Sequence, residues 1–192
     1  MQLKLSQAIE RAKKAGACED ELEVLRGLPD CNVLDLKHKQ APFWAYWYAQ
    51  NVIKDRWIEA EPTIMRNSQS AYWYAVNVIK GRWIEAEPTI MRSPYLAFSY
   101  AKHVIQGRWL KAEPTIMADA EYAYLYAKNV MKGRWPEAEP TIMTEAQWAY
   151  WYAKHVIKGR WIKAEPTIMR SPHRAYYYAK HVFPGPNREE TT

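Results

Sequence analysis

The chain has very little cysteine: Cys18 and Cys31 are the 2 cysteines among its 192 residues. That number is too small for a disulfide framework, and neither cysteine has the additional ligands that a zinc site requires. We therefore expect two free thiols, both buried.

Long apolar runs are also missing. No stretch is long enough to cross a bilayer, and Lys4, Glu10, Arg11, Lys13 and Lys14 interrupt the region where a signal peptide would be apolar. We expect a protein without a membrane segment, located in the cytoplasm.

Motifs of catalysis and metal binding are missing as well. The sequence contains no glycine-rich phosphate loop, no His-Glu-x-x-His and no serine or cysteine in a nucleophile motif. The recurring Glu-Ala-Glu places its two carboxylates on different sides of a helix. His155 and His181 lie one repeat apart, farther than a single zinc ion allows between its ligands. We expect no enzymatic activity, no cofactor and no metal.

Phenylalanine is rare, whereas tyrosine and tryptophan are abundant: 3 Phe stand against 14 Tyr and 10 Trp. Tyrosine and tryptophan combine an apolar body with a polar group, so they suit binding faces that are partly exposed to water. The net charge is +6, with the basic excess toward the C-terminal half. This charge permits contact with nucleic acid or an acidic protein, although the glutamates in every full repeat argue against a continuous phosphate track.

The main feature of the sequence is an internal repeat. The phrase that runs from Arg56 to Met65 returns, almost unchanged, at a period of 26 residues, starting at Arg82, Arg108, Arg134 and Arg160. A second phrase, clearest at residues 149–159, occurs six times, starting at Ala45, Ala71, Ala97, Ala123, Ala149 and Ala175. A fixed period of this kind indicates a solenoid, in which each repeat buries its apolar face against its neighbours.

Each repeat is predicted to contain two helices. In the third copy, Ser93 is a suitable N-cap and Pro94 suits the first helical position, so helix A runs from there to about Gln106, with Gly107 in the left-handed conformation that ends it. Helix B, within residues 109–117, is shorter, and its regular part begins near Pro114. Arg108 and Glu113 recur in all five copies, which predicts an ion pair.

Helical periodicity predicts the core. On helix A one face has the spacing i, i+3, i+4, i+7, i+8, and helix B packs against it; the residues are Ala97, Tyr100, Ala101, Val104 and Ile105 on helix A, and Trp109, Ala112, Ile116 and Met117 on helix B. The predicted fold is therefore all-α, a right-handed-type α-solenoid of two-helix repeats. Residues 1–40 are expected to be an N-terminal helical cap, residues 41–183 a six-copy array with a truncated last copy, and residues 184–192 a disordered tail.

The repeat phrases also resemble a known group of proteins. Gly-Arg-Trp-(Ile/Pro)-Glu-Ala-Glu-Pro together with Trp-Ala-Tyr-x-Tyr-Ala-Lys, over residues 41–183, is similar to the short tandem-repeat proteins of unknown function that are common in bacteriophage and prophage genomes. Four of the five copies depart from the commoner pattern by having Ile or Leu instead of Pro after the tryptophan. The resemblance implies no activity, only a phage protein acting inside a bacterium.

Positions that vary between copies are free to contact a partner. On helix A they form a stripe opposite the core, at the positions of Tyr95, Ser99 and His103, and we call this stripe the aromatic ridge. Aromatic anchors among polar neighbours are typical of interaction hot spots. The predicted partner-binding residues are Phe43, Trp47, Trp73, Tyr95, His103, Trp151, His155, Tyr177 and His181.

The leading hypothesis is a non-enzymatic protein-interaction module, a phage-encoded inhibitor or adaptor that binds a bacterial host or defence protein. One alternative is nucleic-acid binding, in which bases stack on Tyr and Trp while phosphates meet Lys102, Lys154, Lys158, Arg174 and Lys180. A second alternative is a sponge for a small molecule. The ridge could equally serve self-association, or its bulky side chains could fill gaps between successive helices.

Overall fold

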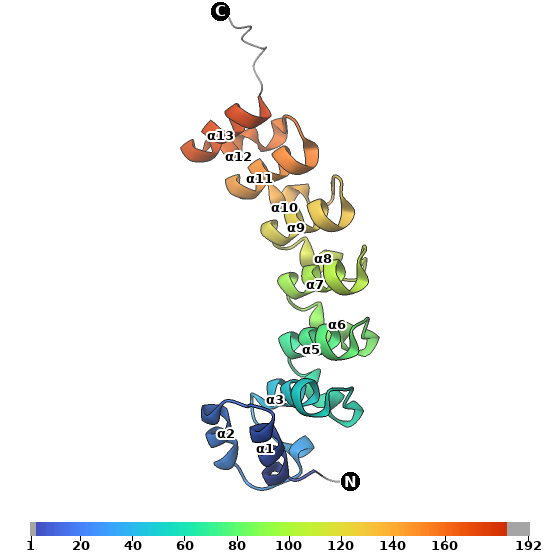
Figure 1. The fold of residues 1–192 in the computed structure, drawn as a ribbon. Helices are drawn as coiled ribbons and strands as arrows, with labels where there is room; N and C mark the ends of the chain where they lie inside the picture. Colours follow the sequence, from blue (N-terminus) through green and yellow to red (C-terminus); the bar gives the residue numbers. More distant parts are fainter. Residues whose placement is uncertain (1–2, 184–192) are drawn as a thin grey trace, which may run out of the picture. The chain divides into compact units, whose positions relative to one another are not determined.

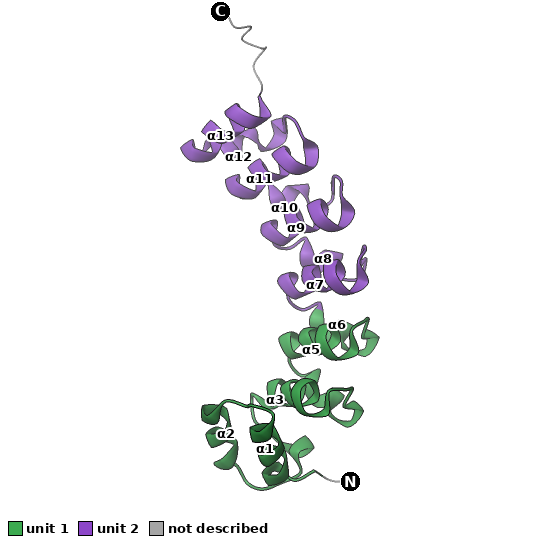
Figure 2. Ribbon diagram, in the orientation of Figure 1, with its two compact units in different colours: residues 1–90 green, residues 91–192 purple. Residues whose placement is uncertain are grey.

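The computed structural model describes residues 3–183, and within them it is helical, with 13 α-helices and no strand. The predicted all-α repeat class is confirmed. The chain divides into two compact units, residues 1–90 and 91–192, which are coloured separately in Figure 2. Residues 3–40 thus belong to the same unit as the first two repeats. The predicted tail, residues 184–192, lies outside the described residues.

Unit 1 begins with a pair of helices that do not follow the repeat. They are separated by Gly16, which has a positive φ of 84°, and they pack beside α3 (Figure 1). Leu5, Ile9 and Leu22 of this pair share one apolar cluster with Trp44 and Tyr48 of α3. The α-helices of unit 1 are α1 (Leu5–Lys14), α2 (Glu19–Arg26), α3 (Ala41–Tyr48), α4 (Glu61–Ile64), α5 (Ser68–Tyr74) and α6 (Glu87–Ile90).

The two cysteines both lie in this N-terminal part. Cys18 precedes α2 and is exposed, whereas Cys31 is half-buried. The expectation of buried thiols is therefore wrong for Cys18. Cys18 lies at the N-cap of α2, outside the buried apolar cluster, so its thiol is accessible to solvent.

Unit 2 contains the remaining repeats, and its helices follow the predicted pattern. The side-chain oxygen of Ser93 accepts a hydrogen bond from the Leu96 N–H, with Pro94 at the start of the helix, as expected for the N-cap. Helix B is one short turn beginning next to Pro114, also as expected. The α-helices are α7 (Pro94–Tyr100), α8 (Glu113–Ile116), α9 (Ala120–Tyr126), α10 (Glu139–Ile142), α11 (Ala146–Tyr152), α12 (Glu165–Met169) and α13 (Pro172–Val182).

Helix A ends differently from the prediction. In five copies its last five residues form a π-helical turn, which widens the helix before it stops; these turns are η2 (Ala49–Ile53), η4 (Ala75–Ile79), η6 (Ala101–Ile105), η7 (Ala127–Met131) and η8 (Ala153–Ile157). The last copy, α13, continues as α-helix to Val182 and lacks the turn. The π turn is thus present where a Trp-containing helix B phrase follows.

The left-handed residue is also not the predicted glycine. Gln106 has φ 57°, and Lys54, Lys80, Lys132 and Lys158 occupy the same position with φ between 55° and 60°. Among the described glycines, Gly16 is the one with positive φ, so the assignment of Gly107 to this conformation is wrong. The left-handed Gln106 directly follows the π turn Ala101–Ile105 and precedes Gly107 by one position.

The predicted core is largely confirmed. Ala97, Tyr100 and Ala101 have no exposed surface, whereas Val104 and Ile105 in the π turn are half-buried. On the helix B side, Trp109, Ala112 and Ile116 are buried and Met117 is half-buried. The small alanines allow close approach of the helices, and the tryptophan supplies the bulk.

A polar clasp joins successive repeats. The Arg108 guanidinium donates two hydrogen bonds of 2.9 Å to the Glu113 carboxylate, so the predicted ion pair lies within one repeat. The Tyr126 hydroxyl, from the next helix A, donates to Glu113 at 3.1 Å and accepts from the Trp109 N–H at 2.7 Å. Burial raises the pKa of Tyr126 to about 12. Tyr74, Tyr152 and Tyr178 make the same pair of bonds in their own copies of the clasp.

Tyr48 occupies the same helix A position in the first copy, before which no helix B phrase exists. Its hydroxyl is buried and has no hydrogen-bond partner in the described residues. Tyr48 thus keeps the ring packing of the repeat but not the clasp, because it contacts Trp57 at 5.3 Å between ring centroids.

Candidate partner-binding surfaces

In unit 1 the aromatic ridge includes two exposed rings. Phe43 of α3 and Trp73 of α5 are 45% and 38% exposed. Trp47, also predicted for the ridge, is half-buried against the N-terminal apolar cluster. Trp47 and Phe43 line a small, mostly apolar pocket of about 160 Å³ beside α2, with Cys18 and Leu22. Phe43 therefore borders the surfaces on both sides of α3.

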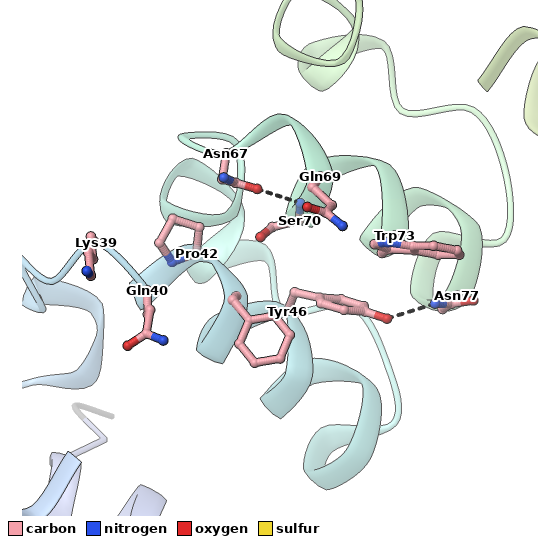
Figure 3. Close-up of a pocket in the computed structure, with 10 residues that line it drawn as sticks. Lys39, Gln40, Pro42, Tyr46, Asn67, Gln69, Ser70, Trp73 and Asn77 are labelled. Atoms are coloured by element: carbon pink, nitrogen blue, oxygen red, sulfur yellow. Dashed lines mark hydrogen bonds between the residues drawn. The ribbon is translucent and has the colours of Figure 1, made fainter. Parts of the chain in front are cut away.

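Phe43 and Trp73 line the larger of these surfaces, an open groove between α3 and α5 with a volume of about 660 Å³. Figure 3 shows the Tyr46 hydroxyl pointing at the Asn77 amide, which donates a 2.8 Å hydrogen bond to it. We call this the unit 1 groove. Its lining residues are Lys39, Gln40, Pro42, Phe43, Tyr46, Asn67, Gln69, Ser70, Trp73 and Asn77.

The helix A segments that form the unit 1 groove have no charge. Residues 41–53 and 68–79 contain no Asp, Glu, Lys, Arg or His. Lys39 is the one cationic residue in the groove lining. The groove therefore offers aromatic faces and amide groups, which suit an uncharged peptide stretch with an apolar side chain.

In unit 2 the ridge is interrupted at its first helix. Ser99, at the central position of the stripe, is buried at 4% exposure, so it does not face outward as predicted. Tyr95 is 48% exposed and contacts the Tyr122 ring, at 5.8 Å between centroids. His103 is exposed. On the first helix of unit 2, Tyr95 is therefore the large aromatic side chain that the ridge exposes.

Farther along unit 2, ridge residues pair within their own helix and with the preceding repeat. Trp151 stacks on His155 and Tyr177 stacks on His181, at 5.0 and 5.7 Å between centroids. His155 forms a 2.9 Å hydrogen bond with the Tyr124 hydroxyl, and His181 a 3.0 Å bond with that of Tyr150. The two histidines therefore link successive repeats, and Trp151 and Tyr177 stack on them within the same helix.

The hydrogen bonds of His155 and His181 repeat a contact that sequence reasoning missed. Asn77 bonds to Tyr46 across the same separation of 31 residues. Asn129, whose partner position is Phe98, turns its amide back to the Leu125 carbonyl at 2.8 Å, because Phe98 has no hydroxyl. The variation between Asn and His thus occurs at a position that links repeats. The sequence signal for this link was Phe98, the one Phe at a helix A position that otherwise has Tyr.

No family model, curated protein or solved structure matches this chain.

His155 provides a test of this packing by pH. Burial, followed by the nearby Lys128 and Lys154, lowers the pKa of His155 from 6.5. The unfolded chain therefore binds the proton more readily, so the stabilisation is present above about pH 6.5 and is lost as the pH falls through the lower folded-state pKa. His155→Asn keeps an amide partner for Tyr124, as Asn77 does for Tyr46, and removes the titration.

We expect the melting temperature of His155→Asn to fall less than that of the wild type between about pH 8 and pH 5. Thermal unfolding followed by circular dichroism at each pH measures the difference. Identical pH dependence of the two proteins would contradict this interpretation.

Within residues 3–183, no three His, Cys, Asp or Glu side chains converge in a way that could hold a metal ion. No helix in the same range is long and apolar enough to cross a bilayer. The surfaces with exposed aromatic or charged side chains on helix A remain the strongest candidates.

Proposed function

We propose that this protein is a non-enzymatic protein-interaction module that binds a segment of a partner protein in the unit 1 groove. We also propose that the solenoid is right-handed. From the resemblance of the repeat phrases to phage tandem-repeat proteins, we propose that the protein is a phage-encoded inhibitor or adaptor, and that it acts on a bacterial protein in the host cytoplasm.

The exposed Phe43 and Trp73 are the observation that supports it. Two large rings at 45% and 38% exposure border one groove of about 660 Å³. Rings of this size cost free energy when left in water, and aromatic residues are enriched at the centres of interfaces. The volume lies in the range of ligand-binding clefts, and its open form fits an extended segment.

The lining also indicates what the segment looks like. The side-chain amides of Gln40, Asn67 and Gln69 can exchange hydrogen bonds with a peptide backbone. The 160 Å³ pocket on the other side of Phe43 has room for one apolar side chain. We expect an uncharged stretch with a large apolar anchor residue.

Affinity capture from bacterial lysate tests the proposal. The double variant Phe43→Ser/Trp73→Ser should reduce recovery of the partner at least roughly tenfold, since truncating a hot-spot residue typically costs more than 1 kcal/mol. Circular dichroism should remain that of the wild type, because both side chains are exposed.

The matched control is Ile58→Ser/Ile84→Ser. Both isoleucines belong to unit 1 and are 68% and 66% exposed, and neither lines the unit 1 groove. This variant should capture the partner as the wild type does. Unchanged capture by the Phe43/Trp73 variant, or equal loss in both variants, would contradict the proposal.

The nucleic-acid alternative depends on bases that stack on aromatic rings. Few of the rings next to the lysines of unit 2 are exposed enough for such stacking. Tyr124 and Tyr150 are 4% and 1% exposed, although Tyr176 is 60% exposed. Ring stacking with nucleotides needs an open aromatic face. The structure therefore gives this alternative less support than the protein-binding proposal.

A further inference from the structure

One position of helix A distinguishes the two units. It lies four residues after the aromatic residue that contacts a neighbouring repeat, which in one copy is Tyr124, the partner of His155. Unit 1 has Gln50 and Val76 there. Every copy in unit 2 has a lysine, and we call these four residues the lysine row: Lys102, Lys128, Lys154 and Lys180.

The fold itself does not require a lysine at this position. A cation near a helix C-terminus is favourable because of the helix dipole, and this alone could explain the four lysines. Gln50 and Val76, however, lie in a π turn that a left-handed residue follows, as Lys102 does, without a lysine at this position. The helix therefore ends normally without a cation here, and the lysine row is a property of unit 2 and not of the repeat.

Each lysine of the row is held against an aromatic ring. The ammonium groups lie 5.7 to 5.9 Å from the ring centroids of Phe98, Tyr124, Tyr150 and Tyr176. Lys128 and Lys154 also donate to the tyrosine hydroxyls at 3.2 and 3.4 Å. Side chains fixed in this way lose less conformational entropy when they bind a ligand.

Within residues 3–183, no lysine of the row forms an ion pair with a carboxylate, and the ion pairs of the repeats join arginine to glutamate instead. The helix A segments of unit 2 contain Glu121 as their one acidic residue and Arg174 as a further cation. Burial is the main cause of the lowered pKa of His155, and Lys128 and Lys154 of the row lower it further.

We propose that the lysine row of unit 2 binds an acidic, extended segment of the partner protein. This inference rests on the proposed function and adds the chemistry of the partner. Adjacent helices are spaced about 8–10 Å apart, and an extended chain rises about 3.3 Å per residue. A segment with a carboxylate at about every third residue would therefore meet one lysine per repeat.

A protein segment fits better than a nucleic acid, because the rings at the row are occupied by the lysines themselves. Phe98, Tyr124 and Tyr150 are 7%, 4% and 1% exposed, so three of the four rings offer no face to a base, and Tyr176, at 60% exposure, is the exception. At the other three lysines a nucleic acid would gain phosphate contacts only, whereas a carboxylate chain needs no stacking.

The test is the affinity of the full chain for labelled probes, measured by fluorescence anisotropy. The probes are a 20-residue polyglutamate peptide, a polyglutamine peptide of the same length and a 20-nucleotide poly(dT) strand. The row variant changes Lys102, Lys128, Lys154 and Lys180 to Gln. The control changes Lys54, Lys80, Lys132 and Lys158 to Asn, which removes the same charge and tolerates their left-handed backbone.

We expect polyglutamate to bind the wild type, with an affinity that falls as salt is added. The row variant should lose about tenfold or more, and the control roughly threefold or less, since charge placement and not only net charge determines the contact. Three results would overturn the inference: no polyglutamate binding by the wild type, equal loss in both variants, or tighter row-dependent binding of poly(dT), which would assign the row to nucleic acid.

The same variants separate this inference from the proposed function. If the row variant captures the natural partner as well as the wild type does, while Phe43→Ser/Trp73→Ser does not, the unit 1 groove is the binding site and the row inference is wrong. If capture survives both sets of changes, the proposed function fails as well.

Discussion

Replacing Trp135 with alanine is expected to lower the free energy of unfolding by about 3–5 kcal/mol. Trp135 is 2% exposed and packs against Tyr126 at 5.1 Å between ring centroids. Because protein interiors are closely packed, the neighbouring side chains cannot fully fill the cavity that the indole leaves. A urea titration followed by far-ultraviolet circular dichroism measures the loss.

The control for this substitution is Ile162→Ala in the same unit. Ile162 is 70% exposed, so its truncation should change stability by less than about 0.5 kcal/mol. A Trp135→Ala protein as stable as the Ile162→Ala protein would show that the helix B tryptophans do not hold the repeats together.

Tyr126→Phe is expected to cost about 1–3 kcal/mol, because it leaves the buried Trp109 N–H without a partner and removes one of the hydrogen bonds to Glu113, which keeps its bonds to Arg108. The Tyr126 hydroxyl donates to the Glu113 carboxylate at 3.1 Å and accepts from the Trp109 N–H at 2.7 Å. Phenylalanine retains the ring and its packing, so the loss measures the polar clasp alone. Chemical unfolding under the same conditions gives the value.

The first repeat supplies a matched control for the clasp. Tyr48 is also buried, at 6% exposure, but its hydroxyl has no partner in the described residues. Tyr48→Phe should therefore leave stability within about 0.5 kcal/mol of the wild type, or raise it slightly, because no hydrogen bond is lost. Equal destabilisation by Tyr48→Phe and Tyr126→Phe would contradict the clasp.

The fold could be predicted where local signals determine it. Ser93 and Pro94 start a helix by capping, and the 26-residue period assigns Ala97, Tyr100 and Ala101 to a buried face. The π turn and the left-handed Gln106 could not be predicted, because they depend on how the Trp109 phrase folds back on its own helix. The preference of glycine for the left-handed conformation predicts that Gly107 ends the helix, one residue after the Gln106 that does so.

The candidate site could be predicted only in part. Variation between copies identified Phe43 and Trp73, which the structure places in one groove. The same variation at His155 arises from pairing with Tyr124 of the preceding repeat. A single helix wheel cannot distinguish a side chain that faces solvent from one that meets the next helix, since both point away from the helix's own core.

Photo-crosslinking from the unit 1 groove tests the central claim most directly. A benzoylphenylalanine at Gln69, which is exposed and lines the groove, is compared with one at Glu85, which is exposed in the same unit and does not line it. We predict one covalent protein adduct from position 69 and none from position 85. An adduct from position 85 alone, or equal adducts from both positions, would contradict binding in the groove.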